Sequence, residues 1–290
     1  LFRKGLLQLR LPRKGGGISN MGAGCFGKLP IHSDFIQHKA EGSEIETLYK
    51  WFQEGMEKVR QTWGNNWESE YRNAPPTRFL FRPDDTSTLL AGVWISGADS
   101  GGTLFPFLLW TPIPKSLLEG PFVTLPLVLW DFLRRAEEVA LGGWNGPSLD
   151  NFLSQVDNLS CSLDFSTGAE KYRTYLNRKM THDIWGALFG SFDDERKYLL
   201  THNLHSLLGK QDGGTPADPL RFPLAPAVLA SFWIDVALRM VRQDSVPTLT
   251  AWNTNNLSLL FPNLDVNHFL PMIRPDLAHE HGLDLARSGR

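Results

Sequence analysis

Three apolar runs between residues 77 and 110 constrain the fold more than any other feature of this sequence. Residues 77–82, 88–95 and 103–110 combine aliphatic and aromatic side chains with few charges, as strands do. Gly97 and the pair Gly101-Gly102 separate the last two runs. The spacing predicts an antiparallel pair of strands joined by a loop of medium length.

Helical and further strand patterns surround these runs. Residues 44–63 have apolar side chains at helical spacing, after a capping-box pattern of Ser43 and Glu46. The other predicted elements are a strand at 23–28, helices at 125–141, 148–159 and 194–208, a surface loop at 209–219, apolar segments at 226–240, 248–252 and 257–261, and a last helix near 265–274. Strands and helices do not alternate strictly. The sequence therefore predicts an α/β fold with a mixed, partly antiparallel central sheet that helices cover on both faces.

The first twenty residues differ from the rest. They carry five basic residues and no acidic one, and Gly15-Gly16-Gly17 follows them. No apolar segment of signal-peptide length is present there. We interpret residues 1–20 as a disordered basic arm, or as an upstream extension of a chain that starts at Met21.

Composition limits the classes of partner. Without residues 1–20 the chain has 24 basic and 31 acidic residues, an unfavourable balance for binding nucleic acid. No apolar run has the roughly 18 residues of a membrane span. Cys25 and Cys161 belong to no metal or redox pattern, which predicts buried thiols in a reducing compartment. We expect a cytoplasmic protein with no integral membrane contact.

Two short motifs imitate catalytic ones. The segment from Gly22 to Lys28 has the spacing of a phosphate-binding loop, but Leu29 stands where Ser or Thr would bind magnesium. Asp99-Ser100-Gly101-Gly102 is similar to the nucleophile motif of trypsin-like proteases, yet its histidine and oxyanion context is missing. We interpret the first as a strand with a glycine-rich start and the second as a hairpin loop. No catalytic residue and no cofactor is predicted.

The histidines predict no metal site, because His202 and His205 have no identifiable third ligand. Seven of the ten tryptophans can be assigned to two groups. Trp63 and Trp67 flank a polar Gly-Asn-Asn segment and are candidate contact aromatics. Those on apolar faces are predicted to be core residues: Trp51, Trp94, Trp110, Trp130 and Trp233.

The segment 24–35 is the most specific motif. It contains Gly24, Phe26, Gly27, Lys28, Pro30, Asp34 and Phe35 in the order Gly-x-aromatic-Gly-Lys-x-Pro-x-x-x-Asp-Phe. A Pro-Pro-Thr-Arg-Phe block follows at 75–79 and a Phe-Pro-Phe block at 105–107. With these blocks and their spacing, residues 22–140 resemble the type VI secretion-associated TagF/ImpM family. Ser33 replaces the glycine usual in that family's motif.

The matched residues have two alternative roles, maintenance of the fold or binding of a partner. They are Gly27, Lys28, Pro30, Asp34, Phe35, Arg78 and Phe79. Gly27 allows close backbone approach, Pro30 ends strand pairing, and Asp34 can cap the segment that starts at Phe35. Arg78 is a candidate ion-pair partner of Asp34. The resemblance divides the chain into a TagF/ImpM-like α/β domain at 21–140 and, at 141–290, a helical and mixed extension packed on the same core.

The resemblance implies a non-enzymatic accessory protein that restrains a bacterial type VI secretion system after translation. The implied partner is a scaffold with a forkhead-associated domain. An alternative from another class is a hydrolase or nucleotide-dependent switch that uses Lys28, Asp34 and His32 in a cleft. A third hypothesis has the basic arm binding acidic lipid or nucleic acid.

Overall fold

Nine strands form the framework of the part of the protein that the structure describes. The computed structural model describes residues 21–178, 181–209, 219–239, 246–261, 264–274 and 283–284. The arm expected at 1–20 and most of the loop expected at 209–219 lie outside these residues. The strands are β1 (Gly24–Gly27), β2 (Ile36–His38), β3 (Thr77–Phe81), β4 (Thr88–Ile95), β5 (Phe107–Pro114), β6 (Leu220–Pro223), β7 (Leu249–Trp252), β8 (Asn256–Leu260) and β9 (Leu283–Asp284).

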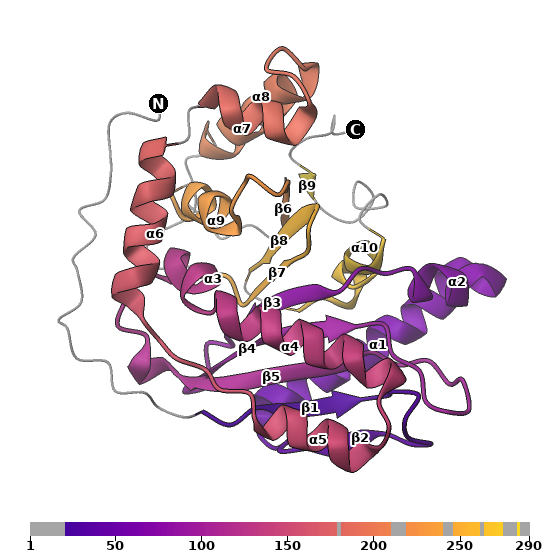
Figure 1. Cartoon of the computed structure of the whole chain (residues 1–290). Coiled ribbons are helices and arrows are strands. Elements are labelled where there is room, and N and C mark those ends of the chain that lie inside the picture. The colour runs from indigo at the N-terminus through magenta and orange to yellow at the C-terminus, as the bar shows by residue number, and fades with distance from the viewer. Residues whose placement is uncertain are drawn as a thin grey trace.

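All nine strands of the described residues belong to one sheet, in the order β2-β1-β5-β4-β3-β7-β8-β6-β9. Neighbouring strands run antiparallel except β6 and β9, which are parallel. The strands from the second half of the chain join those of the first half where β7 pairs with β3 (Figure 1).

Helices cover both faces of the sheet, so the predicted fold class is confirmed. Helices α1 (Ser43–Trp63), α2 (Trp67–Arg72) and α10 (Leu270–Ile273) pack on one face. The other face is covered by α3 (Leu125–Val128), α4 (Trp130–Gly142), α5 (Leu149–Asp157), α6 (Phe165–Arg178), α7 (Thr181–Phe189), α8 (Glu195–Gly209) and α9 (Ala230–Leu238). In Figure 1, α4 and α5 lie in front of the sheet and α1 lies behind it.

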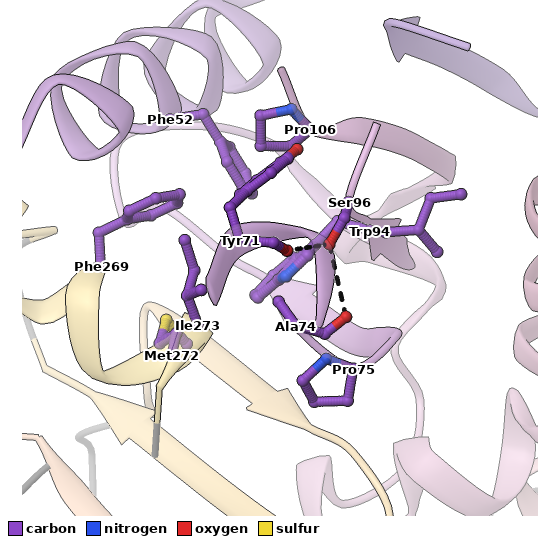
Figure 2. Close-up of a pocket in the computed structure, with 11 residues that line it drawn as sticks. Phe52, Tyr71, Ala74, Pro75, Trp94, Ser96, Pro106, Phe269, Met272 and Ile273 are labelled. Carbon is purple, nitrogen blue, oxygen red and sulfur yellow. Dashed lines mark hydrogen bonds between the residues drawn. The ribbon is translucent and has the colours of Figure 1, made fainter. Parts of the chain in front are cut away.

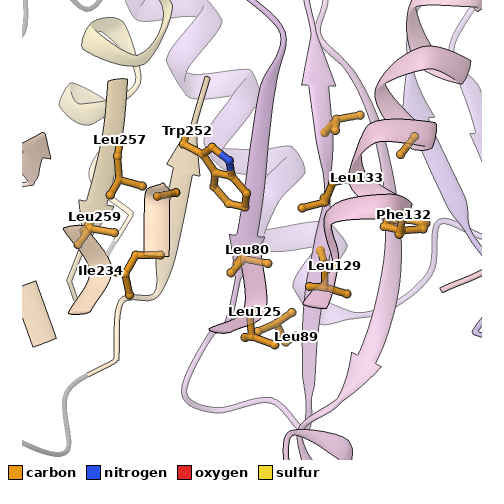
Figure 3. Close-up of a cluster of buried hydrophobic side chains, with 14 of the residues drawn as sticks. Leu80, Leu89, Leu125, Leu129, Phe132, Leu133, Ile234, Trp252, Leu257 and Leu259 are labelled. Atoms are coloured by element: carbon orange, nitrogen blue, oxygen red, sulfur yellow. The ribbon is translucent and has the colours of Figure 1, made fainter. Parts of the chain in front are cut away.

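The two faces of the sheet have separate hydrophobic cores. Successive side chains of a strand point to opposite faces. In β3, Phe79 and Phe81 therefore join the core under α1, whereas Leu80 joins the core under α4. Figure 3 shows this second core running from Leu80 to residues of β7 and β8.

Strand β5 does not begin or end where the sequence predicted a strand at 103–110. It begins at Phe107 rather than at residue 103, and it continues to Pro114. The early residues instead complete a loop that an isolated bridge between Ala98 and Leu104 closes. Pro112 and Pro114 fit the end of β5 because β1 pairs only with residues 108–110, so one side of the strand has no ladder to interrupt.

Other predictions also needed correction. The capping box at the start of α1 is wrong, because Gly42 is the N-cap residue and Ser43 lies inside the helix. The helix predicted at 125–141 is divided into α3 and α4 at Leu129. The last predicted helix is a 3-10 turn (Val266–His268) followed by α10. Six elements have no counterpart among the predicted ones, and all of them are short or rich in polar residues: β2, β6, β9, α2, α6 and α7.

Among the described residues, no helix combines the length and the apolar character that a membrane crossing needs.

Leu80 allows a test of the core under α4. Its side chain is fully buried between β3 and the helices above it, so Leu80→Ala should lower the free energy of unfolding by about 2–5 kcal/mol. Leu141→Ala is the matched control, because Leu141 is 43% exposed on α4 and should cost less than about 1 kcal/mol. Urea denaturation would measure both. Equal losses would contradict the burial described here.

Candidate functional site

Close backbone contact brings the motif segment against the loop before β5. Gly27 ends β1 with a φ of 130°, and a Cβ atom there would lie 2.1 Å from the carbonyl oxygen of Pro106. A Cβ atom at Gly97 would lie 2.4 Å from the carbonyl oxygen of Lys28. Any larger residue at either position would push the two segments apart. The close approach expected at Gly27 is therefore present.

A buried ion pair joins the same two segments. The Lys28 ammonium donates to Asp99 Oδ2 at 2.7 Å, and the two residues are only 8% and 6% exposed. This hydrogen bond is the main reason why the pKa of Asp99 falls to about 2; a hydrogen bond from the Thr103 N–H adds to it. The ammonium also lies 4.8 Å from the centre of the Phe35 ring. Lys28 is thus held by groups of the protein itself.

The ion pair connects two loops at one end of the sheet. Loop 28–35 follows β1, and loop 96–106 joins β4 to β5. The Ser100 N–H donates to the carbonyl of His32 at 2.9 Å, and the Thr103 N–H donates to Asp99 Oδ1 at 2.8 Å. We call the exposed residues of these two loops the loop surface: Ser33, Asp34, Ser100, Gly101, Gly102 and Thr103.

Aromatic rings pack beneath the first loop. The Phe35 ring lies 5.3 Å from that of Phe26 and 5.1 Å from that of Phe105, and Tyr49 of α1 packs against Phe26 at 5.0 Å. Asp34 is exposed and accepts a hydrogen bond from the Phe35 N–H at 2.7 Å. Ring packing and the short backbone contact therefore fix the half-buried Phe35, and Asp34 stays at the surface.

The ion pair predicted between Asp34 and Arg78 is wrong. Arg78 Nε donates instead to Glu137 Oε2 of α4 at 2.9 Å. The guanidinium carbon lies 4.7 Å from the centre of the Trp130 ring. Arg78 shares the face of β3 on which α4 packs, so its side chain reaches that helix. Trp130 was predicted to be a core residue but is 45% exposed.

The other predicted site residues are less accessible. Phe79 is fully buried and stacks on Trp94 at 5.4 Å. Pro30 is half-buried. The candidate contact aromatics Trp63 and Trp67 are also half-buried and pack against the core under α1, with the Arg60 guanidinium 4.9 Å from the Trp67 ring.

A small cavity lies between α1, α2 and α10, next to Ser96 and Pro106 at the two ends of the β4–β5 loop (Figure 2). Its wall is mainly apolar, with Phe52, Phe269 and Met272, and its volume is about 10 Å³. That volume holds about one water molecule. Ser96 Oγ donates at its edge to the carbonyl of Tyr71 at 2.6 Å. The cavity is too small for a substrate or nucleotide.

Metal and thiol chemistry find no support in the described part of the chain. No group of three or more His, Cys, Asp or Glu side chains is placed to hold a metal ion there. Cys25 and Cys161 are buried free thiols, as predicted, and burial raises the pKa of each to about 12. Leu29, which breaks the phosphate-loop pattern, is fully buried in the core under α4.

Sequence reasoning missed the partners of the motif residues. Asp99 was interpreted only as part of a hairpin loop, and Glu137 only as a position on a helix. A buried lysine needs a nearby carboxylate, so the search for a partner of Lys28 could have turned to the loop before β5. Nothing in the sequence identifies Glu137 as the partner of Arg78.

These features define a mixed α/β protein with two loops locked together at one end of its sheet. Residues 24–159 match the family model of the TagF N-terminal domain, type VI secretion system-associated. This match confirms the resemblance found in the sequence. The match extends beyond residue 140, through α5.

Two other comparisons add little. The crystal structure of PA0076 from Pseudomonas aeruginosa PAO1 is 22% identical over 48% of this chain, with a TM-score of 0.40. The aligned part spans 63% of that protein's length, and a likeness at this level establishes neither fold nor function. A search of curated proteins finds no significant match.

The Lys28–Asp99 pair predicts a pH-dependent stability. Because the pKa of Asp99 in the folded protein lies below its ordinary 3.8, the folded state holds the proton less tightly than the unfolded state. The stabilisation should be complete well above pH 4 and decline as the pH falls through 3.8 towards 2.

Urea denaturation from pH 6 to pH 3 should show wild type more stable than Asp99→Asn, with about half of the difference lost at pH 3. Asp85→Asn, an exposed carboxylate at the other end of β3 and β4, controls for loss of charge. A constant difference across this range would contradict the ion pair.

Tyr71 supplies a second test of this end of the sheet. Its hydroxyl accepts a hydrogen bond from the buried Gly97 N–H at 2.8 Å. Tyr71→Phe leaves that donor without its partner and should cost about 1–3 kcal/mol of unfolding free energy. Tyr49→Phe is the matched control, because Tyr49 is 37% exposed and should change stability by less than about 0.5 kcal/mol. A Tyr71→Phe protein as stable as wild type would show that the bond contributes nothing.

Proposed function

We propose that this protein restrains assembly of a bacterial type VI secretion system by binding a scaffold component stoichiometrically. The match of residues 24–159 to the TagF N-terminal domain carries the proposal. The proposed partner is a cytoplasmic scaffold with a forkhead-associated domain. Restraint of this kind requires only that the protein bind one state of the scaffold more tightly than the other.

The arrangement of the motif supports a binding role for the loop surface. Gly27, Lys28 and Phe35 are occupied in holding the two loops together, which leaves Asp34 and its polar neighbours exposed. A preorganised polar loop loses little conformational entropy when a partner binds. The buried members of the motif would then keep the fold, and the exposed members would contact the scaffold.

The geometry does not favour the hydrolase or nucleotide-switch alternative. Lys28 would have to meet a phosphate or a reacting group, but its ammonium is buried against Asp99. The cavity near this end of the sheet holds about one water molecule. We therefore propose a binding protein for this site.

Affinity capture with the full chain tests the proposal. Tagged protein in lysate of a host with an active type VI system should recover components of that system, as read by mass spectrometry. Asp34→Ala should lower the recovery about fivefold or more, because an interface residue of ordinary weight contributes about 1 kcal/mol. Circular dichroism should show no change, since Asp34 is exposed.

Asp85→Ala is the matched control, because this exposed carboxylate lies in the β3–β4 turn at the opposite end of the sheet. It should leave recovery unchanged. Failure of the wild-type chain to recover any type VI component would overturn the proposed function. Equal loss with both variants would argue for a general charge effect instead of a defined surface.

A further inference from the structure

Trp130 at the start of α4 is one of the large apolar side chains exposed on the described surface. Trp130 is 45% exposed, whereas tryptophan is on average a highly buried residue. Single exposed apolar residues are common and need no explanation by themselves. Tryptophan and arginine, however, dominate the residues on which protein interfaces depend, and here the two occur together.

The structure holds this indole in a fixed position. Arg78 comes from β3, and its guanidinium carbon lies 4.7 Å from the centre of the Trp130 ring. Glu137, two helical turns along α4, accepts a hydrogen bond from Arg78 Nε at 2.9 Å. The sheet, the helix and the ion pair together preorganise an aromatic face and a cation side by side, which reduces the entropic cost of binding.

The guanidinium is only partly used. Of its three nitrogens, Nε donates to Glu137, and no acceptor from the described part of the chain binds Nη1 or Nη2. The Arg78 side chain keeps an exposure of 17%. A guanidinium presents its N–H groups as a planar fork that fits the two oxygens of a carboxylate or phosphate. Arg78 therefore has donors to offer an anionic group beside the Trp130 ring.

The surrounding charges select between anionic ligands. Asp131 and Glu138 of α4 are exposed, and Arg134 is paired with Glu138 at 2.6 Å. With Glu137, this part of the helix carries three carboxylates, which Arg78, Arg134 and Arg135 balance in number. Such a surface has no excess of cations, which a polyanion such as nucleic acid or an acidic lipid layer needs. It still accommodates a single carboxylate next to an apolar side chain.

We propose that Trp130 and Arg78 form a docking site for a partner-protein segment in which a carboxylate lies beside an apolar side chain. The carboxylate pairs with Nη1 and Nη2 of Arg78, and the apolar side chain packs on the indole. That the partner belongs to a type VI system rests on the function proposed above. The chemistry of the site does not depend on it.

A two-probe NMR titration of the full chain tests the site. N-acetyl-leucine offers an apolar side chain next to a carboxylate, and N-acetyl-leucinamide is the same molecule without the charge. The Trp130 indole N–H signal, assigned with Trp130→Phe, should shift and saturate with the acid at a roughly millimolar dissociation constant. The amide should bind at least tenfold more weakly.

Four variants separate binding from a structural role. Arg78→Gln should weaken binding of the acid at least tenfold, and Arg78→Lys at least threefold, because lysine keeps the charge but loses the fork. Arg134→Gln, which removes another arginine of the same surface, should leave the affinity unchanged. Glu137→Gln should strengthen binding about threefold by removing the competing carboxylate, whereas a purely structural pair would give no gain.

Several outcomes would overturn the docking site. They are equal shifts with acid and amide, an equal response to inorganic phosphate, and a Trp130 signal that moves with protein concentration alone, which would indicate a second copy.

Affinity capture separates this inference from the proposed function. If Trp130→Ala and Arg78→Lys still recover type VI components as well as wild type, the docking site fails and the proposed function stands. If wild type recovers no type VI component but the titration succeeds, the proposed function fails and the docking site stands.

Discussion

Strand β3 holds two distant parts of the chain in one sheet, and the rest of the structure depends on that pairing. It bonds to β4 along one side and to β7 along the other, so Arg78 lies opposite both Val93 and Trp252. Its side chains enter both hydrophobic cores. The block that begins β3 also supplies Arg78 to the surface of α4. One strand thus connects the family motif, both cores and an exposed aromatic group.

The ion pair at the end of this sheet contributes more to the position of the loops than to the stability of the fold. A buried ion pair is weak support for a stable fold, because removing two charges from water offsets much of their attraction. What the Lys28–Asp99 pair does determine is the relative position of two loops, together with the close contacts at Gly27 and Gly97. Lys28 therefore acts inside the protein, whereas Asp34 lies on the loop surface among uncharged polar neighbours.

Much of the fold could be predicted from local patterns. The helix over 44–63, the strands near 77–82 and 88–95 and the mixed sheet followed from periodicity, because both the side-chain spacing and the flanking turns are local signals. Long-range partners could not be predicted in this way. Arg78 was predicted to pair with Asp34 because both belong to blocks that match the family, whereas Glu137 lies on a helix whose angle across the sheet no local pattern specifies. Trp130 was assigned to the core for the same reason: its exposure depends on how α4 is rotated on the sheet.

The position of β3 has a consequence for how the chain is made. Leu249, the partner of Phe81, follows it by 168 residues, so a ribosome completes the entire TagF N-terminal segment long before β7 exists. Until then β3 is an open edge with unpaired backbone groups and apolar side chains on both faces, the kind of strand that invites pairing with other chains. Slow formation of such long-range contacts prolongs that exposure. A fragment cut at the end of the family match would keep this edge permanently, and the boundary of the family is therefore not a boundary at which the molecule can be safely divided.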